Sequence, residues 1–262
     1  MENILLRILD NKRREVEATA GVLPHESCIS PQKVISMSRA LADDSVGIIA
    51  EFKRCSPSRG MIHPRALVDE VVGSYASAGA AACSVLTDTP FFGGSLVDLD
   101  VARETVSIPL LRKDFIVSKY QIAEACLHGA NAILLIAAAL SREAIEKFTR
   151  EAHRYHLEVL LELHSMAELD KFCPDVDMVG VNNRDLTTFH TDPALSLKMA
   201  SELPDTVVKV AESGLTSMDE VRRLRDVGYR GFLIGEAFMK HPNPGDALRN
   251  FLKDENQGMR SS

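Results

Sequence analysis

The sequence contains no tryptophan and no apolar run of the roughly 18 residues that a membrane-spanning helix needs. Its N-terminal segment, from Met1 to Ala20, carries charges throughout and lacks the apolar core of a signal peptide. We therefore expect a cytoplasmic protein with no membrane partner.

Cysteine is scarce and shows no pairing pattern. The five cysteines include no C-x-x-C pair, so neither a disulfide framework nor a zinc site is indicated. They are Cys28, Cys55, Cys83, Cys126 and Cys173. The histidines are scattered, and only His164 lies near a carboxylate, Glu162, at a predicted strand end. One such pair is more typical of a structural hydrogen bond than of a metal ligand set, so no metal site is predicted.

Positive charge is in the minority. The 30 lysines and arginines are outnumbered by 37 aspartates and glutamates, and the formal net charge is −7. This balance disfavours a broad nucleic-acid surface, so no nucleic-acid partner is expected. A local basic site can still bind a small anion.

Eight short apolar runs alternate with amphipathic segments, and this repetition predicts the fold. The runs are Ile48–Phe52, Ala82–Leu86, Ile108–Leu111, Ala132–Ala137, Leu157–Leu161, Met178–Val181, Val207–Ala211 and Gly231–Ile234. Segments long enough for crossover helices include Ala66–Ala78, Tyr120–His128, Arg142–His156, Ala194–Leu203 and Ser217–Val227. In a chain of 262 residues, eight such units predict an α/β protein with a single (β/α)8 TIM barrel.

Helical patterns also precede the first run, at Glu2–Ala18 and Pro31–Leu41. We expect residues 1–47 to form a helical extension packed on the barrel, residues 48–253 the barrel, and residues 254–262 a C-terminal tail. Gly79, Gly129 and Gly228 stand just ahead of predicted strands, where a glycine fits the end of a helix.

Polar residues follow most of the apolar runs. Active sites of this fold are built at the carboxyl ends of the strands, so these residues are the candidates. They are Glu51 and Lys53 (first run), Arg112, Lys113 and Asp114 (third), Glu162 (fifth), Asn182, Asn183 and Arg184 (sixth), Glu212, Ser213 and Gly214 (seventh), and Gly235 and Glu236 (eighth). Lysines can protonate a carbonyl and glutamates can accept protons. Glu51 and Lys53 alone would equally fit a surface ion pair, but the set favours acid–base chemistry on an anionic substrate.

The ends of the last two strands have a separate meaning. Small residues after strands seven and eight of a barrel leave backbone N–H groups free to bind a phosphate. Ser213, Gly214 and Gly235 suit that task, and Glu236 follows them. Glycines that only turn the chain are the alternative interpretation.

Several segments resemble indole-3-glycerol-phosphate synthase. They are Ile49 to Gly60, Ser84 to Asp88, Phe92 to Ser95, Leu111 to Phe115, Gly180 to Leu186, and Glu212 to Gly214, together with Lys12 to Val16 near the N-terminus. Their order, and their places at successive predicted strand ends, extend the resemblance over nearly the whole chain.

The resemblance implies a step of tryptophan biosynthesis that uses no metal or organic cofactor. In that family, 1-(2-carboxyphenylamino)-1-deoxyribulose 5-phosphate cyclises, loses CO₂ and then water, and gives indole-3-glycerol phosphate. The implied partner is therefore a phosphorylated small molecule, and we expect a monomer or a weak homodimer.

The resemblance also implies roles for individual residues. Lys113 corresponds to the general acid of ring closure, Lys53 to a carboxylate-binding residue or a second acid, and Glu162 to the base of dehydration. Glu51 and Glu212 are expected to hold the lysines. The remaining matches are Asn182, counted with the catalytic set, Ser56 and Arg184 for substrate binding, Phe92, Phe115 and Leu186 as walls for the aromatic ring, and Ser213, Gly214, Gly235 and Glu236 for the phosphate.

The chain departs from the family pattern at two places. Cys55 stands where alanine is usual, and Ser118-Lys119 replaces a common Asp-Pro. Two alternatives remain open at this point: another phosphosugar barrel such as a phosphoribosylanthranilate isomerase, and a barrel that binds a phosphorylated metabolite without turnover. The first relies on an Asp or Cys acid–base pair, whereas this chain offers Glu and Lys. The second needs fewer proton-transfer groups than this chain carries.

Overall fold

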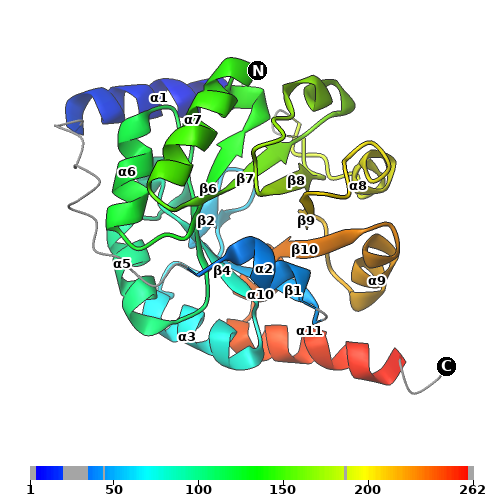
Figure 1. Ribbon diagram of the computed structural model, residues 1–262. Coiled ribbons are helices and arrows are strands. Elements are labelled where there is room, and N and C mark those ends of the chain that lie inside the picture. The colour runs from blue at the N-terminus through cyan, green and yellow to red at the C-terminus, as the bar shows by residue number, and fades with distance from the viewer. Residues whose placement is uncertain (1–3, 20–34, 44, 186–187, 259–262) are drawn as a thin grey trace.

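The computed structural model describes residues 4–19, 35–43, 45–185 and 188–258, in which eight parallel strands close into a barrel (Figure 1). In chain order these are β1 (Gly47–Phe52), β4 (Ala82–Leu86), β5 (Leu110–Lys113), β6 (Ala132–Ile136), β7 (Glu158–Leu163), β8 (Met178–Asn182), β9 (Val208–Glu212) and β10 (Tyr229–Ile234). Each strand pairs with the next, and β10 pairs with β1. The predicted TIM barrel is confirmed, and every predicted apolar run overlaps one strand.

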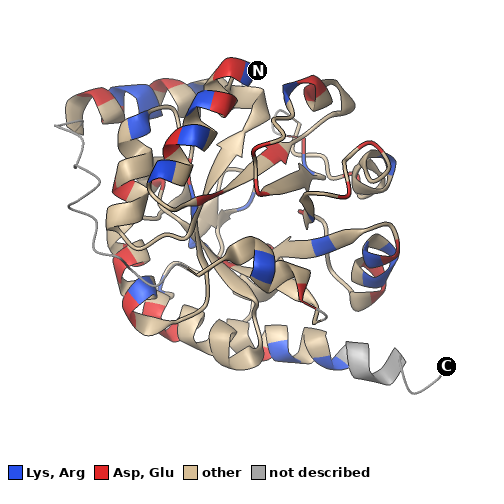
Figure 2. Cartoon of the chain, viewed as in Figure 1, with Lys and Arg blue, Asp and Glu red and all other residues tan. Residues whose placement is uncertain are grey.

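Helices cover the outside of the barrel. They are α3 (Val68–Ala78), α5 (Leu96–Thr105), α6 (Lys119–Leu127), α7 (Arg142–Arg154), α8 (Ala194–Met199), α9 (Met218–Asp226) and α11 (Pro244–Gly258). Figure 2 shows basic and acidic residues interspersed along these helices, as expected for solvated faces. No helix in the described ranges is both long and apolar enough to cross a membrane.

Shorter elements follow several strands. A small antiparallel hairpin, β2 (Cys55–Ser56) and β3 (Gly60–Met61), comes after β1, and α4 (Thr89–Phe92) comes after β4. The 3₁₀ helices η2 (Ala137–Ala139) and η3 (Met166–Lys171) follow β6 and β7, and α10 (Glu236–Met239) follows β10. Because these elements come directly after strands, they line the end of the barrel where the candidate residues were predicted.

The helix ends follow local sequence signals. Gly79, Gly129 and Gly228 have φ values of 102°, 77° and 99°, which confirms that these positions require the left-handed conformation that glycine adopts readily. Ser118 caps α6 in a reciprocal arrangement with Gln121, so the departure from Asp-Pro noted above still provides a good helix start.

Two N-terminal helices close the two ends of the barrel. In α1 (Ile4–Thr19), Leu5, Ile8 and Leu9 are buried and join the cluster of side chains inside the barrel, at the end where the strands finish. In α2 (Met37–Ala42), Met37 and Leu41 fill the opposite end. The carboxylate of Glu158, the first residue of β7, accepts hydrogen bonds from the backbone N–H groups of Met37 and Ser38 at 2.7 and 2.8 Å.

Two of the expected segment boundaries differ from the observed elements. The second N-terminal helix begins at Met37, later than Pro31, and residues 31–34 lie outside the described part of the chain. Helix α11 continues through Gly258, past Asp254 where a tail was expected to begin, and residues 259–262 also lie outside it.

Candidate active site

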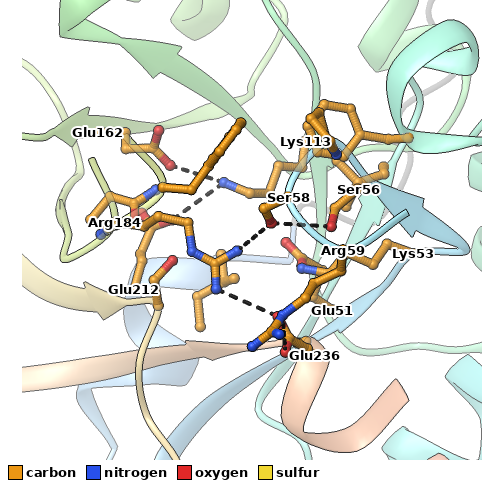
Figure 3. Close-up of a pocket in the computed structure, with 18 of the residues that line it drawn as sticks. Glu51, Lys53, Ser56, Ser58, Arg59, Lys113, Glu162, Arg184, Glu212 and Glu236 are labelled. Carbon is orange, nitrogen blue, oxygen red and sulfur yellow. Dashed lines mark hydrogen bonds and ion pairs between the residues drawn. The ribbon is translucent and has the colours of Figure 1, made fainter. Parts of the chain in front are cut away.

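The carboxyl ends of the strands surround one cavity, and most of the candidate residues line it (Figure 3). Of the predicted site residues, the cavity is lined by Glu51, Lys53, Ser56, Phe92, Lys113, Phe115, Glu162, Asn182, Arg184, Glu212, Ser213, Gly214, Gly235 and Glu236. Leu186, predicted as a wall, lies outside the described residues. Parallel strands end together at one edge of the barrel, which explains why residues far apart in sequence meet here.

Lys113 lies at the centre of the charged set. Its Nζ lies 2.9 Å from Glu162 Oε2 and 3.3 Å from Glu212 Oε2, and Figure 3 shows the two carboxylates on one side of the ammonium group. Burial alone would lower the pKa of Lys113, but Glu162 and Glu212 outweigh it and raise that pKa, so the lysine stays charged.

The two carboxylates differ in their electrostatic state. For Glu162, burial is outweighed by Lys113 and then His164, which hold its pKa well below the ordinary value. Burial raises the pKa of Glu212 well above its ordinary value, and the neighbouring Glu162 adds to that shift. An ionised and a protonated carboxyl group beside one ammonium group form a set in which protons can be exchanged.

Two glycines make room for these carboxylates. At Gly180 on β8, a Cβ atom would overlap Glu212 Oε1, and at Gly235 a Cβ atom would overlap Glu51 Oε1. Gly180 was not among the predicted site residues, because a glycine inside an apolar strand gives no sign of the side chain that will occupy its space.

Glu51 and Lys53 form the second charged pair. Lys53 Nζ donates to Glu51 Oε1 at 2.5 Å, and Glu51 is only 2% exposed. The alternative of a surface ion pair is therefore wrong for this strand end, because one partner is buried in the barrel mouth.

The hairpin β2–β3 folds over one edge of the cavity and contacts the ends of β8 and β10. Arg184 Nη1 donates to Ser58 Oγ at 2.9 Å, and Arg59 Nε lies 2.9 Å from Glu236 Oε1. Arg184 also approaches Glu236, at 3.4 Å (Figure 3). The carboxylate of Glu236 therefore faces two arginines, and Arg59 is a cation that the sequence interpretation did not select.

The predicted phosphate segment has an unusual backbone. Ser213 and Gly214 adopt φ values of 63° and 76°, and the first of these is uncommon for a residue other than glycine. Asn183 supports the turn by donating its Nδ2 hydrogen to the Ser213 carbonyl at 3.1 Å. Neighbouring Asn182 accepts from the Arg184 backbone N–H at 3.1 Å, so these adjacent asparagines have different tasks.

Another part of the cavity lining is apolar. The rings of Phe92 and Phe115 lie 6.0 Å apart between centroids, with an interplanar angle of 36°. Leu134 and Ile136 of β6 extend this wall, and Ile4, Leu5 and Ile8 of α1 complete it. A cavity that is lined by charged groups and by two aromatic rings suits a ligand that carries both charges and an aromatic ring.

The histidine noted in the sequence lies next to this set. His164 Nε2 is 3.1 Å from Glu162 Oε1, while Lys113 approaches the other oxygen of the same carboxylate. Among the described residues, no group of three or more potential ligands is arranged to hold a metal ion.

Comparison with known proteins identifies the family. The family model for indole-3-glycerol phosphate synthase matches residues 5–251 of the chain. The chain belongs to the indole-3-glycerol phosphate synthase family.

Individual relatives agree with this assignment. The indole-3-glycerol phosphate synthase of Bacteroides thetaiotaomicron is 49% identical over 257 residues, which cover 97% of this chain and 99% of that protein. The indole-3-glycerol phosphate synthase of Koribacter versatilis is 43% identical over 259 residues, which cover 96% of this chain and 100% of that protein. Family membership makes this chain a lyase of tryptophan biosynthesis, which confirms the activity implied by the motifs and disfavours the isomerase alternative.

Solved structures that resemble this chain more distantly share its fold. Tryptophan synthase subunit alpha from Legionella pneumophila superposes with a TM-score of 0.62 at 11% identity, over 86% of this chain and 98% of that one. Thiamine phosphate pyrophosphorylase from Pyrococcus furiosus superposes with a TM-score of 0.58 at 14% identity, over 81% of this chain and 96% of that one. At these identities the likeness supports the barrel alone.

Proposed function

We propose that this chain converts 1-(2-carboxyphenylamino)-1-deoxyribulose 5-phosphate to indole-3-glycerol phosphate, CO₂ and water, with the residues of the cavity in the roles below. The observation that carries the proposal is that Lys113 pairs with both Glu162 and Glu212 in the cavity that Phe92 and Phe115 also line. Such a site offers a proton donor to a carbonyl group whose neighbouring aromatic ring is held by the wall.

Ring closure uses Lys113 as the general acid. The ring carbon that bears the carboxylate forms a bond to the carbonyl carbon, and the carbonyl oxygen takes a proton from Lys113. Departure of CO₂ then restores the aromatic ring. Lys53, oriented by Glu51 at 2.5 Å, binds the substrate carboxylate before it leaves or serves as a second acid.

Dehydration uses Glu162 as the base. The carbon beside the nitrogen gives a proton to Glu162, and the hydroxyl group formed in the first step leaves as water after Lys53, as the second acid, has protonated it. Glu162 suits this role because its lowered pKa keeps it ionised. Glu212 has a raised pKa, so it retains a proton that it can return to Lys113. These steps move only protons, CO₂ and water, so they call for neither a redox cofactor nor a metal.

The rest of the substrate is bound at the ends of β8, β9 and β10. We assign the phosphate to backbone N–H groups at Ser213, Gly214, Gly235 and Glu236, and the sugar hydroxyls to Asn182, Arg184 and Ser56. The Glu236 carboxylate would repel a phosphate, so its contacts with Arg59 and Arg184 support a role for its backbone alone.

We also propose that the protein works in the cytoplasm as a monomer or a weak homodimer. Free thiols fit a reducing compartment. They are Cys55, Cys83, Cys126 and Cys173.

The exposed apolar surface supports the proposed monomer or weak homodimer. The exposed large apolar residues come from separate elements, such as Leu6 on α1, Val97 on α5 and Leu197 on α8. Sedimentation velocity at micromolar concentration checks this assignment, and a stable dimer or larger assembly would contradict it.

The direct test is turnover by the purified protein after treatment with a chelator. We expect the anilino-deoxyribulose phosphate to be converted to a product with indole fluorescence, with release of CO₂. Binding of the substrate without turnover would overturn the proposal and would favour the barrel that only binds a phosphorylated metabolite.

A further inference from the structure

Lys12 of α1 is a buried lysine that the proposed chemistry does not use. It is 1% exposed, and its Nζ lies 3.0 Å from Asp88 Oδ2, 3.0 Å from Asp114 Oδ1 and 3.1 Å from Glu15 Oε2. Asp88 and Asp114 are themselves 0% and 3% exposed. Lys12 therefore joins α1 to the segments that follow β4 and β5 through ion pairs that water does not reach.

Both aspartates begin segments that build the aromatic wall. Asp88 caps α4 by accepting from the Phe91 backbone N–H at 2.9 Å, and Phe92 is the last residue of that helix. Asp114 stands between Lys113 and Phe115, and its Oδ1 accepts from the Phe115 backbone N–H at 2.8 Å. The two carboxylates that bind Lys12 thus also fix the backbones that carry the paired rings.

Helix α1 supplies the third side of the same wall. Ile4, Leu5 and Ile8 line the cavity, one to two turns before Lys12 on the same helix. A lysine four residues after Ile8 lies on the same helical stripe, so the contacts that anchor Lys12 also hold the apolar stripe against the cavity.

Lys12 is one of two cations in this cluster of carboxylates. Asp114 has a second cation, Arg112 Nη2 at 3.1 Å, and that arginine also faces Glu124 at 2.9 Å. For Asp88, Lys12 is the cation at ion-pair distance among the described residues. Burial alone would lower the pKa of Lys12, but Asp114 and Asp88 outweigh it and raise that pKa, so it remains charged.

We propose that Lys12 is a positioning residue for substrate binding: it anchors α1 to Asp88 and Asp114, so that the apolar half of the cavity is formed before the substrate arrives. This inference rests on the proposed function, because the aromatic ring of the substrate is the part that would occupy this half. Because the apolar wall is already ordered, substrate binding does not lose free energy to the ordering of its side chains. The phosphate lies at the other side of the cavity and is not held by this wall.

The test compares Lys12→Met with Arg14→Met as a matched control. Arg14 is on the same helix, but it is exposed, and among the described residues its ion pair is with exposed Asp10. We expect Lys12→Met to raise KM about tenfold or more while kcat stays within about threefold, because the lost contacts serve ground state and transition state alike. Inhibition by inorganic phosphate should keep its Ki, since phosphate does not reach the wall. Arg14→Met should match the wild type in KM, in kcat and in the Ki of inorganic phosphate.

A second variant separates anchoring from a general loss of stability. Lys12→Met leaves Asp88 without its cation, so we also examine Lys12→Met with Asp88→Asn, in which the cap on Phe91 can be kept by the amide oxygen. We expect this double variant to recover thermal stability while KM stays high, because α1 is still not anchored. Recovery of KM together with stability would overturn the proposal, as would a wild-type KM in Lys12→Met or an equal loss of phosphate inhibition.

Hydrogen exchange of residues 4–19 provides a readout that does not need turnover. We expect faster exchange there in the double variant than in Arg14→Met, measured under conditions where both are folded, and equal rates would contradict the proposal. If the wild type itself shows no turnover, the proposed function fails, while the exchange measurement still decides whether Lys12 anchors α1.

Discussion

Lys53 and Lys113 have the same functional group but different surroundings. Lys113 faces two buried carboxylates from β7 and β9, at 2.9 and 3.3 Å, whereas Lys53, just after β1, faces Glu51 of that strand. The two ion pairs restrict the movement of the Lys113 side chain toward a substrate group. They also allow Lys113 to exchange a proton with Glu162 or Glu212. This difference supports Lys113 as the proton donor and Lys53 as the residue that binds a substrate carboxylate.

Removal of either member of the central pair should reduce the chemical step. We expect Lys113→Ala and Glu162→Gln each to lower kcat by roughly two orders of magnitude or more, the range for general acid–base groups. Single-turnover experiments measure this directly if product release limits the steady state. Wild-type single-turnover rates in both variants would show that these roles are wrongly assigned.

His164 should set the pH at which the base becomes ionised. After Lys113, it is the next largest of the groups that lower the pKa of Glu162, so its loss should raise that pKa. The base works only when ionised, and a higher pKa means that activity is lost at a higher pH as the solution is made acidic. We therefore expect His164→Asn to move the acidic limb of kcat/KM to higher pH.

The control for this shift is another histidine paired with a carboxylate. His153 Nε2 on α7 lies 3.0 Å from Asp177 Oδ2, and neither residue lines the cavity. His153→Asn should leave the pH profile of kcat/KM unchanged. An unshifted acidic limb in His164→Asn would mean that the histidine only packs against Glu162.

At the scale of whole elements, the hairpin β2–β3 acts as a cover over one edge of the cavity. Its base is held by Arg54, which donates to both oxygens of Asp98 at 2.7 and 2.8 Å. An ion pair between Arg59 and Glu236 holds the tip of the hairpin, although the Arg59 side chain is 62% exposed. The base is therefore the rigid part, and the tip contact is open to solvent and can be broken.

Removal of the tip contact should affect binding more than stability. An exposed ion pair contributes about 0–1 kcal/mol, so Arg59→Ala should leave the melting temperature nearly unchanged. We expect KM to rise because the hairpin no longer rests on the end of β10. A thermal melt and steady-state kinetics, with Arg14→Ala as the exposed control, check this, and an unchanged KM would be evidence against a cover at this position.

The elements themselves were largely predictable, because eight apolar runs and their glycine turns are local signals. The connection from β7 to β8 was not, since η3 is a short 3₁₀ helix without an extended amphipathic pattern. Helix α11 continues into the segment expected to be a tail, and it packs on α3 and α9 through contacts that only the folded chain brings together. Local sequence patterns thus predict the positions of the strands well, but they predict the lengths of the helices between the strands less well.

The membership of the site was predictable from strand ends, but its pairing was not. The contacts of Lys113 with Glu162 and Glu212 depend on barrel closure and on the space left by Gly180, which no spacing in the sequence records. Lys12 did carry a signal. It falls on the stripe of Leu5, Ile8 and Leu9, where a charged residue is unusual for a helix that buries this face.

At the scale of the whole molecule, the two ends of the barrel have different tasks. The end covered by α1 and the β2–β3 hairpin gathers the charged and aromatic residues of the cavity. The end covered by α2 is filled by apolar Met37 and Leu41, and is joined to the barrel by Glu158. In this fold the first end serves chemistry and the second serves stability.

This division predicts that Glu158 contributes to stability and not to turnover. Its carboxylate accepts from the Met37 and Ser38 backbone N–H groups and from the hydroxyl groups of Ser36 and Ser38, at 2.6 to 2.8 Å. Replacement by alanine leaves the start of α2 without these acceptors, and loss of such a cap costs about 0.5–2 kcal/mol. We therefore expect Glu158→Ala to lower the free energy of unfolding by about that amount, measured by urea denaturation, with kcat and KM at wild-type values.

The control for Glu158 is Glu146→Ala on α7, whose carboxylate, within the part of the chain that the structure describes, makes an exposed ion pair with Arg142 at 3.3 Å. Its loss should change the free energy of unfolding by less than about 0.5 kcal/mol. A fall of kcat in Glu158→Ala, in samples shown to be folded, would mean that the two ends are coupled through the barrel. In that case the packing of Met37 and Leu41 inside the barrel would be the path to examine, since those side chains belong to the same cluster as Leu134, which lines the cavity.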